Sequence, residues 1–170
     1  TGAGSGIGRA AAIAFARRGA NIVASDIQLG PLEAVKQEIE TFGVTCLIYV
    51  VDVSNETAIK EFAASVHEKV GAVDVLINNA GIAYFGLFLE SDLEHWPRVL
   101  DVNVMGVVHG CRYFIPQMMA AGGPRQVLTV ATSAGNFPAP SMAAYAASKH
   151  AVAGFSEVLK MELADTQIGI

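Results

Sequence analysis

The sequence predicts an α/β fold, a doubly wound parallel sheet with helices on both faces in three α/β/α layers. Two observations lead to this prediction. Short apolar runs rich in Val and Ile alternate with helical patterns, and a glycine-rich turn, T-G-A-G-S-G-I-G, occupies residues 1–8. Continuous apolar runs of this length are typical of parallel strands that are buried on both faces.

The first expected helix covers residues 7–18, and Gly19 offers a left-handed residue to end it. The second opens at Pro31, because proline suits the first turn of a helix, and ends at Gly43. Ser54 is expected to cap the third. The expected strands are the apolar runs 22–24, 47–51, 73–77 and 127–131.

Two longer helical segments are expected at residues 92–121 and 143–164. The first should be interrupted near Pro97 and again near Pro116, since proline lacks the N–H that a helix interior uses. Residues 167–170 are expected to begin a further strand.

The composition is that of a folded domain with few charges. The chain has 170 residues, of which 52% are hydrophobic and 16% charged, and its net charge is −5. This length suits one domain, and the low charge excludes a disordered chain. The acidic balance argues against a nucleic-acid-binding protein. The longest charge-free stretch contains Asn136, Pro138 and Pro140, which argues against a membrane-spanning helix.

The cysteines and histidines point away from a metal site. Cys46 and Cys111 lie in apolar contexts without metal-ligand spacing, and the four histidines are scattered. We therefore expect no metal, and two buried thiols in a cytoplasmic protein.

The glycine-rich turn is suited to a pyrophosphate. Glycines at 2, 6 and 8 let backbone N–H groups approach phosphate oxygens, and the start of the following helix adds partial positive charge. A plain connection between a strand and a helix is the alternative interpretation, because a glycine-rich turn alone is a weak signal.

Asp26 comes directly after the apolar run 22–24 and Ser25. An acidic residue at the end of the second strand accepts hydrogen bonds from the adenosine ribose in dinucleotide-binding folds. Its charge would repel a 2′-phosphate, so it favours NAD over NADP. Arg9 and Arg17 are the nearby cations that could offset this preference, and an ordinary turn aspartate is the alternative interpretation.

Further motifs follow in order: Asp52-Val53, Asn78-Asn79-Ala80-Gly81, Asn103 in V-N-V-M-G, and Tyr145-Ala-Ala-Ser-Lys149. Together with the turn and Asp26, they make the whole chain, residues 1–170, resemble the short-chain dehydrogenase/reductase family. The resemblance implies a single Rossmann domain that binds NAD(P), carries the catalytic residues and acts on CH–OH groups. A dinucleotide-binding sensor or scaffold without turnover is the alternative function.

The resemblance also assigns roles to residues at the cofactor. Asp52 would accept from the adenine amino group and Val53 would pack on that ring, although Asp52 could equally stabilise the start of the next helix. Asn79 would place its backbone against the adenosine ribose, whereas Asn78 is expected to bond to neighbouring strands. The cofactor-binding set is Thr1, Gly2, Ser5, Gly6, Ile7, Gly8, Asp26, Asp52, Val53, Asn79, Ala80, Gly81, Tyr145 and Lys149.

Tyr145 and Lys149 carry the chemistry that the resemblance implies. Their spacing of four places both on one helix face. A free phenol has a pKa of about 10, and a nearby ammonium is expected to lower it. Tyr145 would then remove the proton of an alcohol while hydride leaves for the nicotinamide. Asn103 matches the family residue that holds a water for proton relay, and a structural helix asparagine is the rival interpretation.

The hydroxyl that would contact the substrate falls on one of two neighbours. The family usually has a catalytic serine three residues before the glycine that follows the fifth strand, and counting back from Gly135 gives Thr132. Adjacent strand residues point to opposite faces, so only one of the two can face the substrate. We favour Ser133 and keep Thr132 as the alternative.

The glycine-rich turn has no strand before it, although such a turn should follow one. We therefore expect a longer protein, with a central strand before Thr1 and further sequence after Ile170.

The resemblance implies a homo-dimer or homo-tetramer formed by the segments 103–119 and 145–163. Residues near the pocket predict an apolar alcohol or ketone as substrate; they are Ile82, Ala83, Tyr84, Phe85, Phe137 and Met142.

Overall fold

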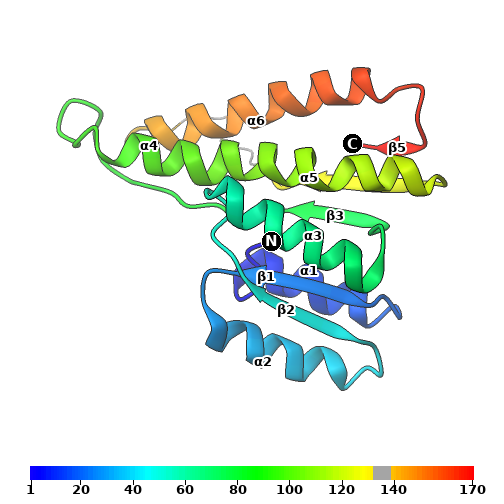
Figure 1. Ribbon diagram of the computed structural model, residues 1–170. Coiled ribbons are helices and arrows are strands. Elements are labelled where there is room, and N and C mark those ends of the chain that lie inside the picture. The colour runs from blue at the N-terminus through cyan, green and yellow to red at the C-terminus, as the bar shows by residue number, and fades with distance from the viewer. Residues whose placement is uncertain (132–138) are drawn as a thin grey trace.

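The computed structural model describes residues 1–131 and 139–170. Strands and helices alternate along the chain, as the sequence predicted (Figure 1). The helices are α1 (Gly6–Ala16), α2 (Leu29–Glu40), α3 (Glu56–Val70), α4 (His95–Leu100), the π-helix η1 (Asp101–Met105), α5 (Gly106–Ala121) and α6 (Ala143–Glu162). The strands are β1 (Ile22–Asp26), β2 (Cys46–Val50), β3 (Val75–Asn78), β4 (Arg125–Thr129) and β5 (Ile168–Gly169).

All the pairings between these strands are parallel. β1 pairs with β2, with Ile22 opposite Cys46. A second sheet has the order β3-β4-β5, with Val75 opposite Gln126 and Arg125 opposite Ile168. Parallel neighbours need long crossovers, which the helices between the strands supply. The predicted strand at the end of the chain is therefore confirmed as β5.

A cleft of about 580 Å³ lies between the two sheets, lined by residues 22–25 of β1 and 75–77 of β3. At the carboxyl ends of these strands the start of the chain bridges them. The Thr1 nitrogen donates to the Ile77 carbonyl (2.9 Å), and the Ala3 nitrogen donates to the Ser25 carbonyl (3.0 Å). The glycine-rich turn therefore begins between the carboxyl ends of β1 and β3.

Two apolar cores lie on opposite faces of β1 and β2, because neighbouring strand residues point to opposite sides. Ala24 packs with α1 and α2, whose Leu32, Val35 and Ile39 are fully buried. Val23, one residue earlier, packs against the other core, whose buried residues come mainly from α3 and α5. The predicted doubly wound, layered α/β fold is therefore confirmed.

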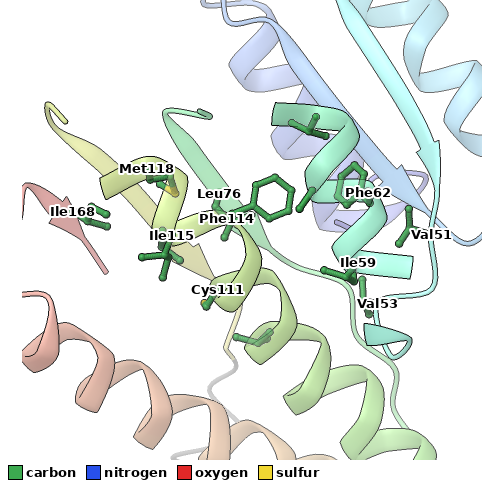
Figure 2. Close-up of a cluster of buried hydrophobic side chains, with 14 of the residues drawn as sticks. Val51, Val53, Ile59, Phe62, Leu76, Cys111, Phe114, Ile115, Met118 and Ile168 are labelled. Carbon is green, nitrogen blue, oxygen red and sulfur yellow. The ribbon is translucent and has the colours of Figure 1, made fainter. Parts of the chain in front are cut away.

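The second core joins α3 and α5 to β3 and β4 (Figure 2). Its aromatic centre is the pair Phe62 and Phe114, with ring centroids 5.5 Å apart. Each large side chain buried there contributes about 1.5–3 kcal/mol. This packing fixes α5, and with it the segment η1 that leads into the candidate site.

Two predicted helix starts differ from the structure. Ser54 does not cap α3: its hydroxyl donates to Asp52 Oδ1 (2.6 Å), and Asn55 Oδ1 accepts from the Ala58 nitrogen instead (3.0 Å). Helix α2 begins at Leu29 rather than at Pro31. Pro31 is tolerated there because the first-turn N–H groups of a helix have no helical acceptor.

The predicted interruption at Pro116 was wrong, because α5 continues through it. Proline in a helix interior costs about 3 kcal/mol. Phe114, Ile115 and Met118 beside it are almost fully buried, and their burial outweighs that cost. Near Pro97 the structure has the first turn of α4, and the π-helical turn that follows was not predicted.

His67 makes the stability of the fold sensitive to pH. Burial lowers the pKa of His67, and its Nε2 atom has no hydrogen-bond partner among the described residues. As pH falls below about 6.5, the unfolded chain takes up a proton that the folded chain resists, so stability is lost. We expect His67→Leu to gain stability relative to the parent protein as pH falls from about 8 to 5. Urea unfolding of both proteins at the two pH values tests this. The same stability difference between His67→Leu and the parent protein at both pH values would contradict it.

Within the described parts of the chain, no helix is both long and apolar enough to cross a membrane.

Candidate active site

A second cleft, of about 660 Å³, lies at the carboxyl ends of β1 and β3. Ligands of doubly wound sheets bind at this edge, where the strand order reverses. Segments far apart in the sequence form its walls: Gly2, Gly4–Ile7, Asp26–Gln28, Pro31, Val51–Val53, Asn79–Ala83, Arg98, Val102, Val130, Ala131, Tyr145 and Lys149.

The glycine-rich turn forms the floor of this cleft and leads into α1. Gly6 has a φ of +50°, which favours glycine, and a Cβ added there would meet nothing within 4 Å. A Cβ at Gly8 would overlap the Gly2 carbonyl, so this position has to be glycine. The first N–H groups of α1 have no helical acceptor, and they lie at the positive end of the helix dipole. The turn therefore has the donors and the open side that a pyrophosphate needs.

Asp26, the last residue of β1, lies beside this turn. Its Oδ2 accepts from the Gly4 nitrogen (2.9 Å), and its Oδ1 accepts from the Gln28 nitrogen (3.2 Å). Each carboxylate oxygen keeps further acceptor capacity for hydroxyl donors in the cleft.

The two cations that could offset the charge of Asp26 are engaged elsewhere. Arg9 forms an ion pair with Glu38 of α2. Arg17 lies over the Phe42 ring, 5.3 Å from its centroid. Neither arginine lines the cleft among the described residues.

Asp52 and Val53 line the cleft after β2. Asp52 Oδ1 accepts from the backbone and hydroxyl of Ser54, and Oδ2 lies 3.3 Å from Nη1 of Arg98. Burial alone would raise the pKa of Asp52, but the hydrogen bonds from Ser54 and the Arg98 guanidinium outweigh burial and lower it. Asp52 is therefore held as a carboxylate, ready to accept from a ligand.

The loop after β3 is tied to the glycine-rich turn. Thr1 Oγ1 accepts from the nitrogens of Asn79 (3.1 Å) and Ala80 (3.0 Å). Nδ2 of Asn79 donates back to the carbonyls of Thr1 (2.9 Å) and Gly2 (3.3 Å). Thr1 and Gly8 themselves line the cleft between the sheets, so they support the turn from behind.

Asn78 differs from its prediction. Its side chain points to α5 rather than to a neighbouring strand, and Nδ2 donates to Sγ of Cys111 (3.4 Å). The absence of a Cβ at Gly110 gives the Asn78 amide this space, since a Cβ there would collide with Oδ1.

Tyr145 and Lys149 reach the same cleft from α6. Lys149 is only 6% exposed; its Nζ donates to the Val130 carbonyl (2.8 Å) and lies 5.8 Å from the Tyr145 ring centroid. Burial lowers the pKa of Lys149. A Cβ at Gly81 would lie 3.6 Å from Nζ, so glycine keeps this end of the cleft open.

Asn103 lies in η1 behind Gly81 and is fully buried. Its Oδ1 accepts from the Ile82 nitrogen (2.8 Å), and Nδ2 donates to the Ile82 carbonyl (2.9 Å) and to Ser148 Oγ (2.9 Å). Both amide hydrogens are thus used by protein groups. A role in a water relay stays a prediction. The two hydroxyl candidates, Ser133 and Thr132, and the pocket candidate Phe137 lie outside the described residues.

A family model described as short chain dehydrogenase matches residues 1–170. The chain belongs to the short-chain dehydrogenase family. Among curated relatives, it is 42% identical to the probable oxidoreductase EphD of Mycobacterium tuberculosis over all 170 residues. It is 35% identical over the same length to the 3-oxoacyl-[acyl-carrier-protein] reductase FabG of Thermotoga maritima.

A solved member of the family has closely similar coordinates. This is a short-chain dehydrogenase/reductase from Burkholderia phymatum in complex with NAD, with 37% identity and a TM-score of 0.95 over 99% of this chain. The chain spans 60% of that protein, 29% of EphD and 69% of FabG.

Sequence reasoning missed two polar residues of this short-chain dehydrogenase. Arg98 lines the cleft beside Asp52, and the buried Ser148 joins Asn103 to α6. For Ser148 the only signal was its place before Lys149. For Arg98 there was none, because 46 residues separate it from Asp52.

Proposed function

We propose that residues 1–170 form one dinucleotide-binding domain that carries the catalytic residues of an oxidoreductase. The reaction would move hydride between NAD and a secondary alcohol or ketone. The observation that carries this proposal is the single cleft into which the glycine-rich turn, Asp26, Tyr145 and Lys149 all open. It brings groups suited to a dinucleotide together with groups suited to acid–base chemistry.

The residues of the cleft fit NAD, which would supply the hydride acceptor when bound. The free N–H groups at the start of α1 would hold the pyrophosphate, and Asp26 would accept from the adenosine ribose hydroxyls. Asp52 would accept from the adenine amino group, with Val53 against the ring. Asn79 and its neighbours Ala80 and Gly81 would line the path toward α6.

Acid–base chemistry falls to Tyr145. Its phenolate would take the hydroxyl proton of the alcohol, and in the reverse direction the phenol would return a proton to the oxygen. Lys149 would stabilise the phenolate, because a nearby ammonium favours the charged form of a phenol. Ser133 would donate a hydrogen bond to the substrate oxygen.

The charge in the cleft supports NAD over NADP. A 2′-phosphate beside Asp26 would face a carboxylate, and like charges at close range repel strongly. Arg9 and Arg17 are engaged away from this point. The NAD complex of the Burkholderia phymatum relative agrees with this preference.

We further propose an apolar substrate, a homo-oligomer and a cytoplasmic location. Ile82 lines the cleft, and Phe85 comes three residues later in the same loop. They expose 37% and 66% of their surface, which suits an apolar ligand. Met119 of α5 and Met161 of α6 are exposed on the helices expected to pair between subunits. Buried free thiols suit a reducing compartment.

The decisive assay follows NADH formation by the purified full-length protein with a panel of secondary alcohols, and NADH consumption with the matching ketones. We expect turnover with NAD and weaker or no turnover with NADP. Tight NAD binding without turnover of any pair would instead identify the non-catalytic sensor or scaffold.

A further inference from the structure

We propose that Ser148 is a positioning residue for the reaction, one that fixes the catalytic helix α6 against the loop after β3. This inference rests on the proposed function. Ser148 is fully buried and lies between Tyr145 and Lys149 in the sequence. Its side chain links α6 to the loop after β3 through Asn103, and both of these elements line the cleft.

The hydroxyl of Ser148 has a hydrogen-bond partner both as a donor and as an acceptor. It donates to the Tyr145 carbonyl (2.7 Å) and accepts from Nδ2 of Asn103 (2.9 Å). The Asn103 side chain in turn accepts from the Ile82 nitrogen (2.8 Å) and donates to the Ile82 carbonyl (2.9 Å). A continuous chain of hydrogen bonds therefore runs from the Ile82 backbone, through Asn103 and Ser148, to the residue that carries the phenol.

The elements at the two ends of this chain both face the cleft. Gly81 directly precedes Ile82 in this loop. A Cβ added to Gly81 would lie 3.3 Å from Asn103 Oδ1 and 3.6 Å from Lys149 Nζ. Asn103 lies within η1, and π-helical turns occur often at functional sites. The polar chain thus sets the spacing between α6 and the loop that would contact the reactive end of the cofactor.

An apolar residue at 148 would break this chain at its centre. The second N–H of Asn103 would lose its acceptor in a buried place, so the amide would be driven to find another arrangement. Small shifts of catalytic groups are costly, because about 1 Å of misplacement can lower the rate by about 10²-fold. The adenosine half of the cleft, formed by Asp26 and Asp52, would stay unchanged.

The test compares Ser148→Ala, Ser148→Cys and Ser25→Ala in the full-length protein. Ser25 is 2% exposed in β1 and does not line the cleft of the candidate active site, so it controls for the loss of a buried serine hydroxyl. The measurements are kcat and KM with saturating NAD, the Kd of AMP as a probe of the adenosine half, and the thermal unfolding midpoint.

We expect Ser148→Ala to lower kcat by about tenfold or more while the Kd of AMP changes by less than about twofold. Ser148→Cys keeps a weak donor and acceptor of similar size and should recover part of kcat. Ser25→Ala should keep the parent kcat. A parent-like kcat in Ser148→Ala, or an equal loss in Ser25→Ala, would overturn the inference. No turnover by the parent protein would instead overturn the proposed function.

Discussion

Tyr145→Phe is expected to lower kcat by about 10²- to 10⁴-fold, the usual contribution of a positioned acid or base. The phenylalanine keeps the ring but has no proton to exchange with the alcohol oxygen. NAD binding should hardly change, because the turn, Asp26 and Asp52 form the rest of the cleft. Steady-state NADH formation together with fluorescence titration of NADH separates these two effects.

Tyr113→Phe is the matched control for this substitution. The Tyr113 hydroxyl donates to Glu56 on the surface, away from the cleft, so its loss should leave kcat unchanged. Equal rates for Tyr145→Phe and the parent protein would refute the assignment of Tyr145. Lost NAD binding in Tyr145→Phe would point to a structural role instead.

Asp26→Ala is expected to weaken NAD binding by about tenfold to a hundredfold. Hydrogen bonds to a charged group are worth about 1.5–3 kcal/mol, and the ribose offers two hydroxyls. The same change should strengthen NADP binding, since the carboxylate no longer faces the 2′-phosphate. Calorimetric titration with both dinucleotides measures the preference directly.

Asp26→Asn separates charge from support of the turn. Its amide oxygen can still accept from the Gly4 nitrogen, which the carboxylate binds at 2.9 Å, but the negative charge is gone. We expect it to keep the unfolding midpoint of the parent and to bind NADP more tightly. Asp165→Ala removes an exposed aspartate from the turn that follows α6 and should change neither affinity. Tighter NADP than NAD binding by the parent protein would rule out the role given to Asp26.

Much of this molecule follows from local patterns. The apolar runs predicted strands at nearly the right residues, and Gly19 and Gly43 do adopt positive φ where helices were expected to end. The spacing of Tyr145 and Lys149 placed them on one helix face, and both line the cleft. Such features depend on residues within a few turns of one another, so the sequence reports them well.

Competition between neighbours explains the local errors. Ser54 is a good cap by type, yet Asp52 takes its hydroxyl and Asn55 becomes the cap. Pro116 was expected to break α5, but the packing of its buried face keeps the helix continuous. In both cases the interaction that determines the structure involves other residues, and the helix preference of the single residue takes no account of them.

The layered α/β fold, the family and the residue types that suit a dinucleotide and a proton transfer could all be predicted from the sequence. Which of these residues lie in one cleft depends on the folded structure. Only the folded chain places Asp52 beside Arg98, joins Ser148 to Asn103 across 45 positions and engages Arg9 with Glu38. Contacts of this kind are set by the packing of helices on a sheet, which couples residues at separations that no local pattern records.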